Sequence, residues 1–354
     1  MASPGSSLDA LGYGPFFSCQ VTAAEARSLL PGRAVEDRGR RLAVSFQDGE
    51  RLVTVPGRLR ARGEVPVVGD FVLAPPGEEP PVARVLARRT VLSRGAAGRA
   101  AAEQALAANV DVVCLVHGLD AGVKPRRIER TLAAVYACGA EPVVVLAKAD
   151  LDDDLEGALA EASAAAPASP VLAVSARTGE GIEAVRALLA PGRTGVFVGP
   201  SGSGKSTLVN ALLGEEVQPT AAVRARDARG RHTTAGRRLL RVPRGGAVID
   251  GPGIRELKLW DAAGIGEAFE DVSAIAGGCR FGDCAHEDEP GCAVRAAVEE
   301  GKLDPVRLES LRKLEAEARA ARLRRGGAEA RAEKQRWRAV ARDIRRFYRD
   351  RGRE

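Results

Sequence analysis

The sequence is poor in aromatic residues and contains no long apolar run. Aromatic residues make up 4% of its 354 positions, and only three histidines are present. A membrane-spanning helix needs about 18 or more consecutive apolar residues, and no such stretch occurs. Residues 1–14 lack the basic and apolar regions of a secretory signal. We therefore expect a cytoplasmic protein with no membrane partner.

Positive charge is concentrated at the C-terminal end of the chain. Residues 321–354 contain thirteen Arg or Lys and five Asp or Glu, a net +8 against +6 for the whole chain. Such a segment favours an anionic partner. Trp337, Phe347 and Tyr348 lie among these arginines, which fits contact with RNA phosphates and bases. The alternative is a solvated helix whose aromatic side chains pack back on the body.

Six cysteines fall into two groups of different character. Three are scattered through apolar segments and are typical of small buried side chains in a cytosolic protein: Cys19, Cys114 and Cys138. The other three cluster with a histidine in a short glycine-rich loop: Cys279, Cys284, His286 and Cys292. Four such ligands close a tetrahedral zinc shell, so the cluster predicts a structural Zn²⁺ that folds this loop. Reduced cysteines without a metal are the alternative.

Residues 38–92 contain several short runs of alternating apolar and polar residues. The runs are 41–46, 51–55, 70–73 and 82–86, and Gly- or Pro-containing turns separate them. Closely spaced short strands without helical periodicity indicate a small β-barrel. We expect an OB-type barrel, the common version that binds oligonucleotides. A barrel used only for protein contacts remains the alternative.

Residues 109–198 alternate between strand and helix patterns. Continuous apolar runs at 110–116, 142–146 and 172–174 are separated by helical spacing over 124–138, and a further helix is expected at 182–189. The sheet is expected to continue through 196–198 to 247–249. Apolar strands alternating with helices indicate an α/β domain whose parallel sheet is covered on both faces.

A glycine-rich loop between the 194–198 strand and a helix from Thr207 carries the clearest chemistry. Its residues fit the G-x-x-x-x-G-K-[ST] phosphate-binding pattern: Gly199, Pro200, Ser201, Gly202, Ser203, Gly204, Lys205 and Ser206. Glycines allow backbone N–H groups to surround a phosphate at a helix N-terminus. Lys205 is expected to reach the β- and γ-phosphates and to support catalysis, and Ser206 is expected to bind Mg²⁺. The pattern predicts a nucleoside triphosphate site.

Two motifs upstream of this loop indicate guanine. Ala147, Lys148, Ala149 and Asp150 end one strand and resemble the [NT]-K-x-D base motif, whose carboxylate accepts hydrogen bonds that adenine cannot donate. Ser175, Ala176 and Arg177 end the next strand and resemble the S-A-[KR] motif, whose backbone contacts guanine O6. Both lie at strand ends of one sheet, where such ligands bind.

Two further motifs follow the phosphate loop. Residues 230–234 fit a switch I segment in which Thr233 or Thr234 completes the Mg²⁺ shell. Residues 250–253 fit the D-x-x-G switch II motif, in which Asp250 holds the metal through water and the Gly253 N–H meets the γ-phosphate. The base motifs therefore precede the phosphate loop, whereas an ordinary GTPase has them last. The domain is predicted to be circularly permuted, which close termini permit.

This order, with a barrel before and a zinc module after, resembles the ribosome-small-subunit-dependent GTPase A (RsgA) family. The resemblance extends from Leu11 to the helical tail and includes the runs 109–111, 130–132, 230–234 and 250–256. Two residues depart from the family pattern. Ala147 replaces Asn or Thr, which removes a side chain that supports the base site, and Gly251 replaces Thr.

The resemblance implies a GTPase that acts in late maturation of the small ribosomal subunit, with the subunit and its rRNA as partners and ribosome-stimulated hydrolysis. Ile254 occupies the position where many GTPases have a water-orienting Gln, so intrinsic hydrolysis should be slow. His232 is the candidate for orienting the water. Its alternative role is to shape the switch or contact RNA. A P-loop ATPase or kinase and an RNA-binding module with little turnover remain competing classes.

We expect a monomer of three parts: residues 1–95 with the barrel, residues 96–259 as the permuted GTPase domain, and residues 260–354 as the zinc module with basic helices. The expected nucleotide site comprises the phosphate loop with Thr207, the base motifs and Gly253. Its expected Mg²⁺ ligands are Ser206, Thr233, Thr234 and Asp250.

Overall fold

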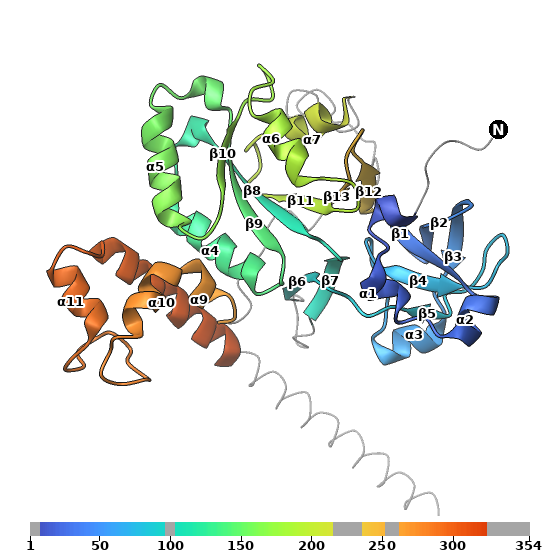
Figure 1. Cartoon of the computed structure of the whole chain (residues 1–354), viewed down its shortest axis with the longest axis horizontal. Helices are drawn as coiled ribbons and strands as arrows, with labels where there is room; N and C mark the ends of the chain where they lie inside the picture. The colour runs from blue at the N-terminus through green and yellow to red at the C-terminus, as the bar shows by residue number, and fades with distance from the viewer. Residues whose placement is uncertain (1–7, 96–102, 215–235, 252–261, 324–354) are drawn as a thin grey trace, which may run out of the picture.

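The computed structural model describes residues 8–95, 103–214, 236–251 and 262–323 (Figure 1). Its centre is a sheet with the order β10-β9-β8-β11-β13-β12, in which β12 is antiparallel to β13 and the other neighbours are parallel. These strands are β8 (Val112–Gly118), β9 (Glu141–Ala147), β10 (Val171–Val174), β11 (Thr194–Val198), β12 (Arg238–Arg241) and β13 (Ala247–Asp250). The predicted α/β sheet is confirmed.

Helices cover both faces of this sheet. Along β8, Val113 and Leu115 belong to one apolar core, and Cys114 and Val116 belong to a second core on the other face. The first core contains side chains of α4 (Pro125–Tyr136) and α5 (Leu155–Ala165), and the second contains those of α6 (Ile182–Leu188) and α7 (Lys205–Leu213). Burial on both faces explains why the strand sequences are continuous apolar runs rather than alternating ones.

The N-terminal strands form a small barrel. Pairing gives the order β3-β2-β1-β4-β5, and a bridge from Thr54 to Pro81 brings β3 toward β5. The elements are β1 (Leu30–Arg38), β2 (Arg41–Phe46), β3 (Gly49–Thr54), α3 (Gly57–Arg62), β4 (Phe71–Ala74) and β5 (Arg84–Val85). A five-stranded, partly open ring of this kind is an OB-type barrel. Three short helices precede it: η1 (Leu8–Leu11), α1 (Pro15–Ser18) and α2 (Ala23–Ser28).

The first barrel strand lies outside the range that the sequence pattern predicted. β1 begins at Leu30, whereas the alternation was recognised only from residue 38. The strand was not predicted because it contains Pro31 and Gly32, and both residue types indicate a turn by sequence criteria. Gly32 is required by packing instead: a Cβ there would lie 2.5 Å from Val44 Cγ1.

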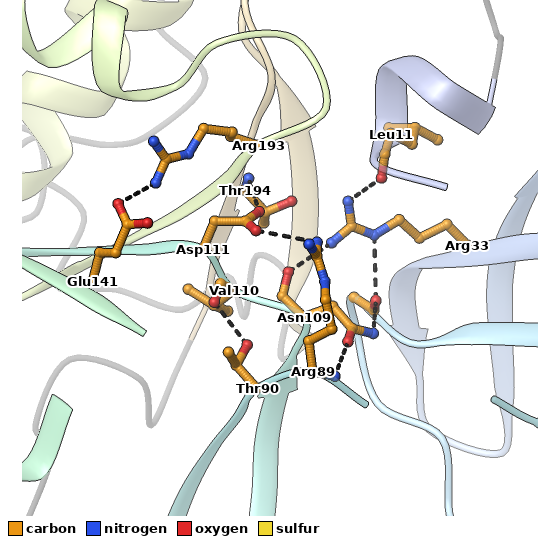
Figure 2. A network of polar contacts seen from close by, with 11 residues as sticks. Leu11, Arg33, Arg89, Thr90, Asn109, Val110, Asp111, Glu141, Arg193 and Thr194 are labelled. Atoms are coloured by element: carbon orange, nitrogen blue, oxygen red, sulfur yellow. Dashed lines mark hydrogen bonds and ion pairs between the residues drawn. The ribbon is translucent and has the colours of Figure 1, made fainter. Parts of the chain in front are cut away.

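A hairpin and a hydrogen-bonded junction join the barrel to the central sheet. β6 (Val91–Gly95) pairs with β7 (Glu103–Ala108), so the boundary expected at residue 95 falls between two paired strands. The guanidinium of Arg33 in β1 donates to the carbonyl oxygens of Leu11, Gly69 and Asn109, as Figure 2 shows in part. β1 also pairs with β12 through Glu36 and Arg238.

The described C-terminal region, residues 262–323, is helical and contains no strand. It comprises α9 (Ile265–Ala268), α10 (Glu270–Ala276), α11 (Ala293–Glu299) and a helix over residues 305–323. It lies beside α4 (Figure 1). Arg307 of the last helix joins the two, because its guanidinium binds Glu129 Oε1 at 2.7 Å and Asp271 Oδ1 at 2.9 Å.

No helix within the described ranges is long and apolar enough to cross a membrane.

Candidate nucleotide site and metal centre

The glycine-rich loop connects β11 to α7 at the carboxyl end of the sheet, where β8 and β11 lie side by side. This is the point at which the strand order reverses, since the chain leaves β8 toward β9 on one side and leaves β11 toward β13 on the other. Gly199 has φ +147°, and a Cβ there would lie 2.3 Å from the Val116 carbonyl oxygen. Gly204 precedes α7 with φ +100°. Both positions require glycine, as the phosphate-loop pattern implies.

Lys205 begins α7 and its side chain folds over the loop. The ammonium donates to the carbonyl oxygen of Gly199 at 2.8 Å and to that of Pro200, and it lies 3.4 Å from Ser203 Oγ. The residue is 9% exposed, so its charge is held at the loop rather than in bulk solvent.

The base motif lies against the same loop. A Cβ on Gly118, at the end of β8, would lie 3.4 Å from Ser203 Cα and 3.5 Å from Lys148 Cε. Ala147 Cβ would lie 3.4 Å from a Cβ on Gly204. The structure therefore brings the predicted base and phosphate motifs together, and the side chain of residue 147 faces the loop.

Two side chains orient the carboxylate of Asp150. Ser175 Oγ donates to its Oδ1 at 2.5 Å, and Arg177 Nε donates to its Oδ2 at 2.7 Å. The Ser175 hydrogen bond, and then that of Arg177, lowers the pKa of the Asp150 carboxyl below its ordinary value. A carboxylate has about four acceptor positions, so each oxygen can still accept a hydrogen bond from a base. Asp150 is thus an oriented, charged acceptor.

Two residues of this site were missed by the sequence analysis. Gly118 ends β8 beside the loop, and Asp120 in η2 (Leu119–Ala121) accepts from Lys148 Nζ at 2.6 Å. Lys148 precedes η3 (Ala149–Leu151) with φ +61°. The only available signal was that Gly118 ends a buried parallel strand and Asp120 follows it, which is where ligands bind in such sheets.

The predicted switch residues are only partly within the described ranges. Asp250 ends β13, next to the strand that leads to the phosphate loop. Gly251 has φ +154°, and a Cβ there would lie 2.7 Å from Arg237 Cα, which accounts for glycine at this position. Four predicted site residues lie outside the described ranges: His232, Thr233, Thr234 and Gly253. Ile254 and the aromatic residues of the basic tail also lie outside them.

The predicted metal ligands converge at the start of α11. The ligand atoms of Cys279, Cys284, His286 and Cys292 all lie within 4.8 Å of one another. His286 Nδ1 is 3.6 Å from Cys279 Sγ and 3.5 Å from Cys292 Sγ. Tetrahedral zinc with Zn–S bonds of about 2.3 Å places its ligand atoms roughly 3.8 Å apart, so the donor set and spacing fit Zn²⁺.

A phosphate loop joined to a guanine-type base motif, in a sheet whose strands follow this chain order, defines a circularly permuted P-loop GTPase. The family profile described as RsgA GTPase matches residues 85–260. The small ribosomal subunit biogenesis GTPase RsgA of Opitutus terrae is 43% identical over 351 residues, which cover 94% of this chain and 96% of that protein. The chain therefore belongs to the RsgA family.

A second relative and two solved structures are also similar to this chain. The protein of the same name from Xanthomonas euvesicatoria is 46% identical over 309 residues, covering 85% of this chain and 84% of that protein. The crystal structure of YjeQ from Thermotoga maritima covers 82% of this chain and 98% of its own, with a TM-score of 0.64 and 28% identity. YloQ, described as a circularly permuted GTPase, shares the fold with a TM-score of 0.62 and 23% identity over 82% of this chain and 96% of its own.

Proposed function

We propose that this protein hydrolyses GTP in the presence of Mg²⁺ and acts in the biogenesis of the small ribosomal subunit. The biological role is supported by relatives that cover 94% and 85% of the chain and carry that name. A cytoplasmic location follows from this role. The GTP state binds the subunit, and hydrolysis stimulated by the subunit releases the protein.

The oriented carboxylate of Asp150 is the observation that supports guanine most directly. Guanine donates from N1–H and from its exocyclic amine, and Asp150 accepts both. Adenine presents an acceptor at N1, so it leaves the charged carboxylate unpaired, which gives strong discrimination. Ala147 contributes no side-chain hydrogen bond here, so base selection depends on Asp150 with Ser175, Ala176 and the stem of Lys148.

The remaining site residues are assigned by position. The loop amides of residues 199–206 and Thr207 hold the phosphates together with Lys205, and Ser206 and Asp250 hold Mg²⁺ directly and through water. The switch residues outside the described ranges complete the site: Thr233 or Thr234 on the metal, Gly253 on the γ-phosphate and His232 on the attacking water. Ile254 has no polar group for that last task.

The Cys₃His cluster holds one structural Zn²⁺ in this proposal. Its four ligands leave no open coordination position for chemistry. Contact with rRNA through the basic tail and action as a monomer complete the proposed function.

One assay separates this function from its competitors. Hydrolysis of GTP and of ATP is measured with and without purified small ribosomal subunits. We expect GTP-selective turnover that rises strongly with subunits. ATP turnover would indicate an ATPase or kinase, and no turnover in any condition would indicate an RNA-binding module.

The variant Asp150→Asn tests whether Asp150 recognises the guanine base. An amide donates where a carboxylate accepts, so GTP affinity should fall by about 10²-fold or more and affinity for xanthosine triphosphate, which presents a carbonyl there, should rise. Unchanged GTP affinity would contradict the assignment of Asp150.

A further inference from the structure

The barrel is incompletely closed, and a groove lies at the opening. The groove has a volume of about 630 Å³ and is lined by six residues from β3 and from the segment between β4 and β5: Glu50, Arg51, Leu52, Gly77, Glu78 and Glu79. The strand and the segment meet only at their far ends, where Thr54 N donates to Pro80 O and Val82 N donates to Thr54 O. Among the described residues, no backbone hydrogen bond joins residues 77–79 to β3, and the groove lies between them.

The backbone of β3 faces this groove with unpaired groups. Phe46 and Gly49 are paired across a two-residue turn, so hydrogen-bonded pairs with β2 occur at Gly49, Arg51 and Val53. The N–H and C=O groups of Glu50 and Leu52 therefore point away from β2, in the same direction as those of Thr54. On the side away from β2, no described strand pairs with β3 at Glu50 or Leu52. This is an open strand edge.

Charge around the edge is negative. Glu50 and Glu78 are exposed and make no ion pair within the described part of the chain. Glu79 is paired with Arg41 at 2.6 Å, and Arg51 is paired with Asp48. Two carboxylates thus remain uncompensated beside the unpaired backbone. OB-type barrels bind oligonucleotides on this face and on the loop between β4 and β5, but phosphates would meet like charge here.

We propose that this groove binds an extended, Lys- or Arg-rich segment of a partner protein as an added β-strand on β3. Backbone pairing at Glu50 and Leu52 gives affinity, and the two free carboxylates select basic side chains at alternate positions. The proposal does not depend on the proposed GTPase function. It assigns this face of the barrel to protein contacts.

Fluorescence anisotropy with the full-length protein tests the proposal. The probe is a labelled ten-residue peptide of alternating Lys and Thr, and the comparison probe carries N-methyl groups at every second backbone nitrogen. The parent peptide should bind, and N-methylation on the pairing edge should remove binding without a change in charge. Equal binding of both peptides, or no binding of either, would overturn the proposal.

Charge variants and hydrogen exchange locate the site. The double variant Glu50→Gln, Glu78→Gln should weaken peptide binding by about tenfold at low salt. Glu64→Gln, which removes an exposed carboxylate of the same barrel outside the groove, should have no effect. The peptide should slow exchange of the Glu50 and Leu52 amides. An unchanged affinity of the double variant, or slowing of these amides by a ten-nucleotide single-stranded RNA in place of the peptide, would refute the proposal.

Discussion

The barrel and the C-terminal module are each joined to the GTPase domain by a buried arginine, but the two guanidinium groups have different partners. Arg33 is 2% exposed, donates to three carbonyl oxygens and lies 5.0 Å from the centre of the Phe71 ring. Arg307 is 7% exposed and binds two carboxylates above the Phe269 ring. The Arg33 junction uses backbone acceptors alone, whereas Arg307 combines its two ion pairs with hydrogen bonds to the carbonyl oxygens of Ala165 and Ala268.

The pKa values of the two groups reflect this difference. Burial lowers the pKa of Arg33 to about 10, although the nearby Asp111 charge opposes the shift. Burial acts in the same direction on Arg307, but the hydrogen bonds that it donates to Asp271 and Glu129 outweigh burial and raise its pKa. The barrel junction therefore tolerates an incompletely neutralised charge, whereas the C-terminal junction depends on mutual neutralisation. Loss of one partner should be more costly in the second case.

Metal removal should cause the largest loss of stability, and it should affect the C-terminal module but not the barrel. Structural zinc contributes about 10–16 kcal/mol of apparent binding free energy in small zinc domains. A chelator should therefore unfold residues 279–292 and α11, seen as fast hydrogen exchange there, while β1 and β2 stay protected. Protection of α11 that survives complete zinc loss, measured by elemental analysis, would contradict a structural metal.

Arg307→Met should destabilise the C-terminal junction by about 3–5 kcal/mol. The variant leaves the carboxylate of Glu129, which is 3% exposed, buried without its cation. Denaturant unfolding combined with hydrogen exchange in α10 measures the effect. Adding Glu129→Gln should restore part of the loss. Arg126→Met is the matched control, because its ion pair with Glu309 is exposed and should be worth less than about 1 kcal/mol. Equal losses in the two single variants would contradict the argument.

Acid should weaken the side of the sheet that carries the C-terminal junction. His117 of β8 is buried, and burial, followed by the charge of Arg127 on α4, lowers its pKa from 6.5 to about 4. The unfolded chain binds this proton more readily than the folded one. The free energy of unfolding is therefore unaffected by His117 above pH 6.5 and falls as the pH drops toward 4. The difference between these two pKa values corresponds to a loss of about 3 kcal/mol in the free energy of unfolding below pH 4.

His117→Gln should flatten this dependence between pH 6.5 and 4 relative to the unmodified chain. Unfolding midpoints in urea across this range provide the measurement. The other acid-sensitive groups are common to both proteins and cancel in the difference. Identical pH profiles for the two proteins would show that His117 does not carry the effect.

The sequence patterns predicted the architecture well but not the junctions. Strand and helix periodicity located the central sheet and the phosphate loop, because these depend on local spacing. The motifs 109–111 and 130–132 were recognised only by resemblance, and the structure shows what they contact. Asn109 Nδ2 donates to Gly69 O, Asp111 Oδ2 accepts from Thr194 N, and Arg130 pairs with Glu317. These contacts join residues 40 to 187 positions apart, and no local pattern encodes them.

The nucleotide site divides in the same way. The loop glycines and the position of Asp150 after a buried strand could be predicted, since backbone conformation dictates both. The roles of the Ser175 and Arg177 side chains could not, because each depends on the distance between two strand ends. The roles of the Zn ligands and of the switch residues remain predictions from motifs. The prediction of the Zn ligands is the better supported of the two, because the structure brings their ligand atoms together.

Arg33→Met should produce the smallest loss, about 2 kcal/mol. The substitution leaves the carbonyl oxygens of Leu11 and Asn109 without this donor. The loss is limited because Gly69 O keeps the hydrogen bond from Asn109 Nδ2 at 3.0 Å, and because a desolvated cation is removed at the same time. Hydrogen exchange in η1 and β1 should rise while α10 is unaffected. Arg38→Met on the same strand is the matched control and should change little, because that side chain is 50% exposed and its partner Glu36 keeps the ion pair with Arg238. A loss as large as that of Arg307→Met would show that Arg33 is neutralised by Asp111 and Asp70 at longer range, and that both junctions depend on buried charge.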